Sequence, residues 1–454
     1  MSKLKKILSI FCLAAAFLLL AACGDPASSL FPAKTVKFQA GAVEIEGTTD
    51  LTITLESGET ALLDQLPELQ KADFSGSACV DEIYQWAQAH PDVKVRYTVT
   101  LPDGQVLSSS EQSLDLSELT DSAVSDTLQA LAYLPKVNDI QLGSERSGLG
   151  WDSVRAIMDA CPNASVSYTF WLYGKEFSTV DTTINLSHIP VEDNGAQVMQ
   201  AMACMPNLVS VDMDSCGVSN EDMAAIRDAY PDVKVIWRVW FGDYYSVRTN
   251  VERILASMPG KAGELTTEST RSLKYCTKVK YMDLGHNNLL DTIDFVSYMP
   301  DLEVLIVGMT FVEDFYPLEN CPKLEYLEAM TSRLHDLRPL ANLKNLKHLN
   351  ICYNFAITDI TPLYGLTQLE RLWIGKYDPV PPEQIEKIKE LLPNCVVNST
   401  VADPTDGGWR VDEEPNEFGD SQQAARYTLL REQFGYHEED FSYYWNDRLC
   451  IRPY

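Results

Sequence analysis

One local pattern recurs along most of this chain and constrains its fold more than any other feature. Residues 90–95 read HPDVKV and residues 230–235 read YPDVKV, and both belong to a larger set of similar stretches. In this set a mostly apolar residue precedes Pro, Lys or Thr, and another apolar residue follows two positions later. The second position falls at Pro67, Pro91, Pro135, Pro162, Pro206, Pro231, Thr277, Pro300, Pro322, Lys344, Thr367 and Pro393. Because most intervals are 22–27 residues and the others are close to twice that, the sequence predicts stacked repeating units.

The repeat is most regular between residues 279 and 374. Each turn has apolar residues at its first, fourth and sixth positions and, in most turns, a small polar residue at its ninth. The turns begin at Val279, Leu302, Leu324, Leu346 and Leu369. Alternating apolar side chains point inward from one short strand, and the ninth side chain can satisfy backbone groups where the chain turns. Stacked turns then bury a continuous core that no single turn could form.

These turns resemble the leucine-rich repeat. Residues 337–374 are similar to the 22-residue repeats of bacterial internalins, with Asp-x-x-Pro-Leu turns at 336–340 and 359–363. The sequence departs from that pattern at Phe355-Ala356, which adds one residue, and at Tyr377, where Asn is expected. The resemblance implies an α/β solenoid, that is, a stack of strand-containing turns.

The N-terminal half is less regular. Residues 208–233 resemble the longer ribonuclease-inhibitor type of repeat, with Cys216 at the Asn/Cys position. Ser219 or Asn220 can cap a helix that runs from about 221 to 229. Residues 93–109, 165–180 and 233–249 alternate apolar and polar residues around a central glycine, which predicts a β-hairpin insertion in each. We therefore interpret residues 67–276 as three larger units of about 70 residues, each with a hairpin insertion.

The first residues predict export and a lipid anchor. Three lysines precede an apolar run from Ile7 to Leu20, which ends in Leu20-Ala21-Ala22-Cys23. This resembles a bacterial lipoprotein signal, which implies lipidation of Cys23; an ordinary secretory signal cut near Ala22 is the alternative. Acyl chains on Cys23 would hold the protein on a membrane. The predicted organisation is a signal peptide at 1–22, a tether at 23–34, irregular long repeats at 35–276, regular repeats at 277–399, and a linker with a C-terminal cap at 400–454.

Charge and cysteine usage exclude several classes of function. The chain carries 36 basic and 65 acidic residues, and such an acidic surface repels nucleic-acid backbones. Nine cysteines remain after Cys12 and Cys23 are set aside, and no CxxC occurs. The sequence therefore predicts no disulfide framework, no zinc cluster and no cofactor, and calcium binding would depend only on bulk acidity.

No catalytic motif stands out in the sequence. There is no GxGxxG, Walker-type loop, GxSxG or HExxH, and the six histidines are scattered. Cys161, Cys276 and Cys321 share a repeat position with leucines and methionines, so we interpret them as buried structural thiols. We predict that the chain is not an enzyme and has no catalytic residues.

The repeat register also predicts a binding face. In leucine-rich repeats the third and fifth positions of each turn line the concave face, where aromatic residues and arginine favour protein partners. The candidate partner-binding residues are Tyr281, Asp283, Ile306, Tyr326, Glu328, His348, Asn350, Arg371 and Trp373. Ile306 is expected to be exposed on this face.

These features predict a monomeric, lipid-anchored protein on the extracytoplasmic face of a bacterial membrane, which binds a protein or another cell-surface macromolecule. The internalin-like repeats favour a Gram-positive cell. One alternative is a lipoprotein that captures a solute, peptide or glycan in a pocket formed by the hairpins. Another is a surface hydrolase whose site is not visible in the sequence. A passive envelope spacer also fits the sequence.

Overall fold

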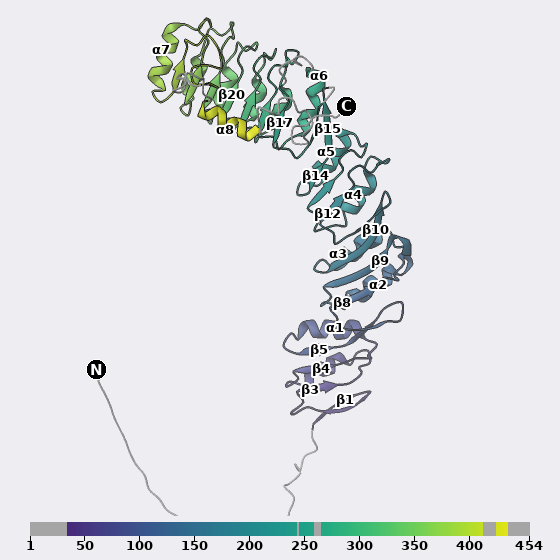
Figure 1. The fold of residues 1–454 in the computed structure, drawn as a ribbon. Coiled ribbons are helices and arrows are strands. Elements are labelled where there is room, and N and C mark those ends of the chain that lie inside the picture. Colours follow the sequence, from purple (N-terminus) through teal and green to yellow (C-terminus); the bar gives the residue numbers. More distant parts are fainter. Residues whose placement is uncertain (1–33, 243–244, 258–264, 412–423, 435–454) are drawn as a thin grey trace, which may run out of the picture. The chain divides into compact units, whose positions relative to one another are not determined.

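The computed structural model describes residues 34–242, 245–257, 265–411 and 424–434 (Figure 1). They separate into two compact units. Unit 1 comprises residues 34–114 and 122–138, and unit 2 comprises residues 115–121 and 139 onward. The predicted signal peptide, the tether up to residue 33 and Cys23 lie outside the described residues. Within those residues, no helix is long and apolar enough to cross a membrane.

Unit 1 begins with an antiparallel pair and continues with a small parallel sheet. Strand β1 pairs with β2, β3–β4–β5 form the parallel sheet, and β6 and β7 form the predicted hairpin. The strands are β1 (Thr35–Phe38), β2 (Gly41–Glu44), β3 (Asp50–Thr52), β4 (Lys71–Asp73), β5 (Lys94–Arg96), β6 (Thr98–Thr100) and β7 (Val106–Ser108). The helices are η1 (Thr60–Gln65), α1 (Val80–Ala89) and α2 (Val124–Leu131); β8 (Ser113–Leu116) and η2 (Asp121–Ala123) span the limits between the units.

Unit 2 repeats the same plan in its first part. Strand β9 pairs in parallel with β10, which folds back on β11 as the second predicted hairpin. A parallel sheet β12–β13–β14 follows, and then the third hairpin, β15–β16. The strands are β9 (Asp139–Ser144), β10 (Ser165–Leu172), β11 (Lys175–Ser178), β12 (Thr183–Asn185), β13 (Ser210–Asp212), β14 (Lys234–Ile236), β15 (Arg238–Phe241) and β16 (Tyr245–Arg248). The helices are η3 (Glu145–Ser147), α3 (Trp151–Ala160), α4 (Ala196–Met202) and α5 (Asn220–Ala229). As predicted, Ser219 caps α5, because its side chain accepts a hydrogen bond from the backbone N–H of Asp222.

The second part of unit 2 is one continuous parallel sheet of seven strands, in sequence order. Its strands are β17 (Arg253–Leu255), β18 (Tyr281–Asp283), β19 (Val304–Ile306), β20 (Tyr326–Glu328), β21 (His348–Asn350), β22 (Arg371–Trp373) and β23 (Val396–Asn398). Short helices return the chain between them: α6 (Thr267–Thr270), η4 (Arg271–Tyr275), η5 (Asp294–Tyr298), η6 (Tyr316–Asn320), η7 (Arg338–Asn342), η8 (Thr361–Gly365) and α7 (Pro382–Leu391). The central residues Met282, Leu305, Leu327, Leu349 and Leu372 are paired in register and fully buried.

The polar ninth position of each turn does what the sequence predicts. The side-chain amide of Asn287 donates to the carbonyls of Ala256 and Leu284 at 3.0 and 2.8 Å. The amide of Asn354 donates in the same way to Ala329 and Ile351, both at 2.9 Å. These buried side chains satisfy backbone carbonyls inside the turns, so they tie each turn to the one before it.

The eighth position shows a regularity that sequence reasoning missed. His286, Met309, Thr331 and Tyr353 all have φ between 54° and 63°, in the left-handed region. His188 and Ser215, at the same position in the irregular repeats, share this conformation. The left-handed residue turns the chain sharply away from each strand, and the rest of the fold holds it there at a cost in strain.

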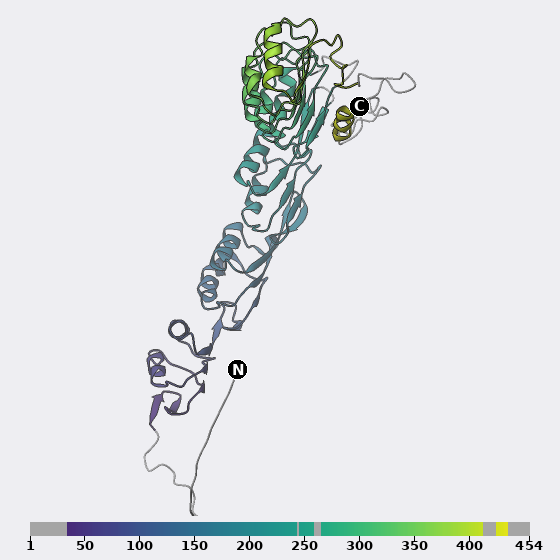
Figure 2. The same cartoon turned by 90° about the vertical axis from the view of Figure 1, so that its left-hand side faces the viewer.

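The last helix, α8 (Ala425–Phe434), does not lie with the other helices. In Figure 2, α8 (yellow) and α7 (light green) lie on opposite sides of the strands of the regular sheet. The chain therefore returns, after its last repeat, to the side of the sheet that faces away from the connecting helices.

Candidate functional site: the strand face and the strap

The nine predicted binding residues lie together on one side of the regular sheet. We call this side the strand face. It is formed by the third and fifth positions of the repeat turns that contain β18–β22, which are the first and last residues of each strand. Tyr281, Val304, Tyr326, His348 and Arg371 make up one column, and Asp283, Ile306, Glu328, Asn350 and Trp373 make up the other. The columns predicted from the repeat register are therefore confirmed.

The strand face is not open to solvent. Residues 401–411, which we call the strap, and helix α8 pack on it. Together with the strand face they form one buried cluster, which includes Val304, Ile306, Tyr326, Trp373, Val401, Trp409, Leu430 and Phe434. The sequence predicted that residues 400–454 form a linker and a C-terminal cap. The described part of this segment packs on the strand face of the regular repeats.

Trp409 is the centre of this contact. Its side chain is completely buried, with its ring centroid 5.2 Å from that of Tyr326 and 5.4 Å from that of Trp373. The guanidinium carbon of Arg371 lies 4.6 Å from the centroid of the Trp409 ring. Tilted aromatic pairs and a cation over a ring each stabilise a contact beyond the area that it buries. The strand face thus encloses one tryptophan on three sides.

A buried ion pair lies beside Trp409. The carboxylate of Glu328 has no exposed surface, and it pairs with the guanidinium of Arg410 and accepts a hydrogen bond of 2.8 Å from the indole N–H of Trp409. Tyr326 also donates to this carboxylate, at 2.9 Å. Burial disfavours the charged form of Arg410, but the adjacent Glu328 outweighs it and raises the pKa of Arg410 above its usual value. Because an unpaired buried carboxylate is costly, Glu328 depends on Arg410 from the strap.

The strand face also holds the strap by its main chain. Asn350 donates to the carbonyl of Pro404 at 2.8 Å, Trp373 donates to that of Asp406 at 3.0 Å, and Arg371 donates to that of Gly408 at 2.6 Å. The hydroxyl of Tyr353 donates to the carbonyl of Ala402. The strap is folded into consecutive turns, closed by hydrogen bonds such as those from the N–H groups of Arg410 and Val411 to the carbonyl of Thr405. The strand face therefore holds it through alternate main-chain carbonyls that project from these turns.

His348 is buried in neutral form within this site. Its Nδ1 accepts a hydrogen bond of 3.1 Å from Nε of Arg371, and its Nε2 lies 3.8 Å from a carboxylate oxygen of Glu370. Burial, followed by the charges of Arg371, Arg426 and Lys347, lowers the pKa of His348 to about 3. A neutral imidazole with an arginine hydrogen bond on one nitrogen serves as an acceptor that fixes the Arg371 side chain, which in turn holds the strap.

The burial of the strand face corrects the sequence interpretation. Seven of the nine predicted residues are buried and only Tyr281 and Arg371 are partly exposed. Ile306, which was expected to be exposed, has 2% of its surface accessible. The reason is that the strap and α8 cover positions that the repeats alone would leave open. Binding of a partner to these residues stays a prediction.

The chain matches no protein-family profile and no curated protein sequence. Among solved structures it is similar to an internalin (inlF) from Listeria monocytogenes, with 16% identity, 79% of this chain and 85% of that chain covered, and a TM-score of 0.25. It is also similar to a leucine-rich-repeat protein from Leptospira interrogans, with 15% identity, 78% and 94% covered, and a TM-score of 0.28. Such scores carry no argument about function. The in-register strands and inward leucines identify the repeats directly. They are leucine-rich repeats.

The residues that sequence reasoning missed are Trp409 and Arg410, which supply most of the strap's contacts. A signal for them was present. The two columns contain Val304, Ile306, Tyr326 and Trp373, which is too apolar for a solvated face of a strongly acidic chain. A downstream segment with an isolated tryptophan was a candidate to cover them.

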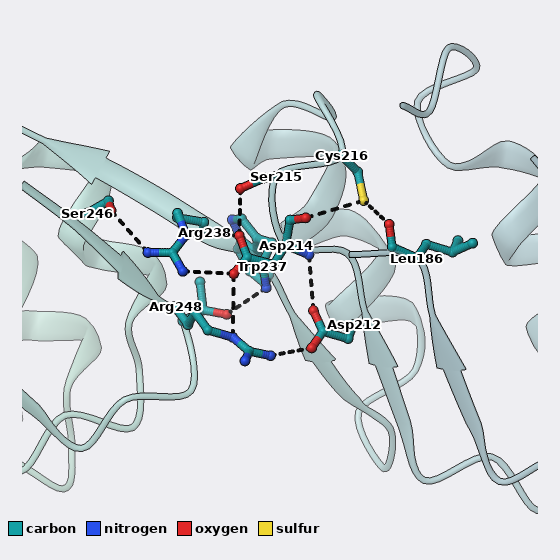
Figure 3. Close-up of polar contacts among 10 residues, drawn as sticks. Leu186, Asp212, Asp214, Ser215, Cys216, Trp237, Arg238, Ser246 and Arg248 are labelled. Atoms are coloured by element: carbon teal, nitrogen blue, oxygen red, sulfur yellow. Dashed lines mark hydrogen bonds and ion pairs between the residues drawn. The ribbon is translucent and has the colours of Figure 1, made fainter. Parts of the chain in front are cut away.

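A second polar cluster joins the third hairpin to the preceding sheet (Figure 3). Arg238 at the start of β15 binds the carboxylate of Asp214 through two hydrogen bonds of 2.9 Å, and Arg248 at the end of β16 pairs with Asp212. Nε of Arg248 lies 3.8 Å from Asp214. Burial would raise the pKa of Asp214, but the hydrogen bonds from Arg238 outweigh it, so the pKa of this carboxyl lies below its usual value. The cluster fixes the hairpin against the sheet.

A cavity of about 840 Å³ lies where the parallel ladder is interrupted between β14 and β17. Its lining includes the buried aromatic rings of Trp237 and Tyr275 and the polar side chains of Arg227, Asn250 and Lys278. Nη1 of Arg227 and Oδ1 of Asn250 are buried without a hydrogen-bond partner.

The cysteines in the described part of the chain are free thiols. Cys276 and Cys321 are fully buried, and burial raises the pKa of each to about 12, which confirms that they are structural. Cys161 is only partly buried, which corrects its assignment to the core. Within the described ranges, no group of three or more His, Cys, Asp or Glu side chains is arranged to hold a metal ion.

Proposed function

We propose that this chain is a membrane-anchored binding protein that takes a protein partner on the strand face of its regular repeats. The observation that carries the proposal is the strap itself. A segment of consecutive turns lies on this face with its carbonyls hydrogen-bonded to Asn350, Trp373 and Arg371 and its tryptophan enclosed by Tyr326 and Trp373. These are the contacts by which a protein surface binds a foreign peptide.

A partner would reach this face after the strap and α8 had moved away. The core of the repeats consists of their first, fourth and sixth positions, such as Leu346, Leu349 and Ile351, and the strap adds nothing to it. The repeats can therefore stay folded when the strap leaves. The face would then present Tyr281, Asp283, Ile306, Tyr326, Glu328, His348, Asn350, Arg371 and Trp373 to a partner.

The test compares the soluble chain, residues 24–454, with two variants of it. Trp409→Ala combined with Arg410→Ala removes the side chains that hold the strap and leaves the strand face intact. Tyr326→Ala combined with Trp373→Ala, added to that variant, damages the face itself. We expect a cell-surface protein to bind the first variant and to lose at least tenfold in affinity for the second, when the captured protein is purified and titrated. Equal binding by both variants would contradict the proposal.

The proposal includes the anchor and the organisation predicted from the sequence. Lipidation of Cys23 would place the repeats on the extracytoplasmic face of the membrane, with 23–34 as a tether, followed by the irregular repeats at 35–276 and the regular repeats at 277–399. Cys23→Ser is expected to move the protein from the membrane fraction to the soluble extracytoplasmic fraction, because one residue carries the acyl chains. Fractionation after radiolabelled fatty-acid feeding measures both effects. A variant still in the membrane fraction would contradict the lipid anchor.

The cavity between β14 and β17 supports a second candidate, the capture of a small polar solute. Its volume and its polar lining, which includes Arg227, Asn250 and Lys278, are the observation that favours this function. A thermal-shift screen of sugars and short peptides would measure it, with Asn250→Leu as the control. A solute that stabilises the chain equally with and without Asn250 would not be bound in this cavity.

A further inference from the structure

We propose that the strand face selects peptide segments in which a large aromatic residue is followed directly by arginine, and that Trp409-Arg410 of the strap is the chain's own copy of that motif. This proposal rests on the proposed function and adds the chemistry of the partner. Three features of the site determine that chemistry: an aromatic enclosure, a buried carboxylate and a row of donors for main-chain carbonyls.

The aromatic enclosure sets the first residue of the motif. Tyr326 and Trp373 lie on neighbouring columns of the sheet, two strands apart, and leave room for one ring between them. Trp409 fills that room completely and donates its indole N–H to Glu328 at 2.8 Å. A tryptophan gains both the ring contacts and this hydrogen bond, whereas phenylalanine gains only the ring contacts.

The buried carboxylate sets the second residue. Glu328 projects from the C-terminal end of β20 into the strand face, where no other cation within the described residues pairs with it besides Arg410. When the strap leaves, this carboxylate must be paired again by the partner or must be solvated. Arginine meets the requirement better than lysine, because its planar guanidinium donates to both carboxylate oxygens and stays charged in a buried site.

The donors for main-chain carbonyls set the conformation of the segment and its direction. Asn350 and Trp373 bind the carbonyls of Pro404 and Asp406 in a segment of turns, in which the N–H groups of Arg410 and Val411 donate to the carbonyl of Thr405. Arg371 binds the carbonyl of Gly408, directly before the tryptophan. Gly407 and Gly408 have φ of 70° and 88°, so the turn before the tryptophan favours glycine. The side chains that the face selects are then the aromatic residue and the arginine that follows it.

The experiment titrates a fluorescent peptide, Asp-Gly-Gly-Trp-Arg-Val, which copies residues 406–411, into the full chain with Trp409→Ala and Arg410→Ala. Matched peptides replace its Trp by Ala or its Arg by Glu. We expect the copied peptide to bind at least tenfold more tightly than either matched peptide. The unmodified chain should bind it at least tenfold more weakly than the variant, because the strap already occupies the face. Circular dichroism establishes that the variant is folded.

A matched change on the protein tests the pairing directly. We add Glu328→Gln to the chain that already carries Trp409→Ala and Arg410→Ala, which we call the emptied chain. Its affinity for the copied peptide should fall at least tenfold, and its affinity for the peptide with Glu in place of Arg should be unchanged or higher. Equal affinity for all three peptides, or no binding of any, would overturn the selectivity. Uptake of the strap of a second copy, with no uptake of short peptides, would also overturn it and would indicate exchange of straps between chains.

A second design keeps every contact and serves if the emptied variant does not fold. A protease site inserted after Thr400, an exposed residue, allows the folded chain to be cut so that the strap and the rest of the C-terminal segment become a separate fragment. Excess copied peptide should release this fragment, and the matched peptides should not. Failure of this competition overturns the inference about the motif, whereas capture of a partner that lacks the motif would leave the proposed function standing.

Discussion

Two sheets of unit 2 carry an acidic residue at the same repeat position, and each is covered in a different way. Asp212, the last residue of β13, occupies the fifth position of its repeat turn. The hairpin that begins two residues after β14 supplies Arg248 to pair with it. Glu328, the last residue of β20, also occupies the fifth position of its repeat turn. Its partner Arg410 lies 82 residues further along the chain. The hairpin is inserted between strands of the fold, whereas the strap follows the last strand. Only the strap can leave its sheet without breaking the connection between repeats.

Removal of the strap's tryptophan should have the largest effect and should be local. Trp409→Ala is expected to destabilise docking of the strap by about 4 kcal/mol, because a completely buried tryptophan is lost. Amide exchange in residues 401–411 should then accelerate on the order of 100- to 1000-fold, since each 1.36 kcal/mol is one decade. Hydrogen exchange followed by mass spectrometry measures it. An equal acceleration in β18–β22 would show that the strap is part of the repeat core.

The corresponding change in the hairpin should act on the whole unit. Asp214 is buried, and Asp214→Asn weakens its carboxylate contacts with two arginines. We expect this change to lower the free energy of unfolding by about 3 kcal/mol. Because the hairpin lies within the chain of strands, the loss should appear in the denaturant midpoint of unit 2. Loss of hairpin protection with an unchanged midpoint would mean that the hairpin is as separable as the strap.

Acid should separate the two regions further. The folded-state pKa of His348 is about 3, below its ordinary value of 6.5. The unfolded chain therefore binds a proton first, and stability is lost as pH falls from about 6.5 towards 3, by on the order of 1 kcal/mol per pH unit. The protonated ring would also face Arg371 and Arg426, and Arg426 belongs to α8. The pKa of Asp214 is lowered from its ordinary value, so acid affects the hairpin pair less than it affects His348.

At pH 5 we therefore expect the strap to exchange faster while the hairpin is unchanged. The measurement is hydrogen exchange at pH 5 and pH 7, corrected for the intrinsic rates. His348→Gln removes the titrating group and serves as the matched control, in which the difference between the two pH values should shrink. A difference that persists in this variant would assign the acid sensitivity to other groups.

The smallest effect is expected at an exposed ion pair, which sets the baseline for the comparison. Lys323 contacts Asp301 at 2.6 Å between neighbouring repeats, but its side chain is 59% exposed. Lys323→Ala should therefore change the free energy of unfolding by about 0.5 kcal/mol. A loss above 2 kcal/mol, measured by denaturant titration, would show that burial is not what distinguishes the Glu328 and Asp214 pairs.

The repeats were predictable because their information is local. The apolar residues at positions one, four and six of each turn all fall within a stretch of nine residues. Each glycine-centred hairpin also lies within a stretch of about 17 residues. The contacts of the strap were not predictable in this way. Trp409 meets Tyr326 and Trp373 across long sequence separations, and residues 401–411 carry no periodicity that would assign them to a sheet. The sequence therefore located the strand face and its columns, but not the segment that covers them.

The carbonyl contacts of the strap have a consequence for how its sequence can change. Asn350, Trp373 and Arg371 bind oxygen atoms that every amino acid possesses. Homologous straps could therefore drift widely at Ala402, Pro404 and Asp406 and still dock. The tryptophan, the arginine and the two glycines before them, whose φ values are 70° and 88°, would be held by selection. An alignment of such tails would therefore show four fixed columns in an otherwise variable stretch.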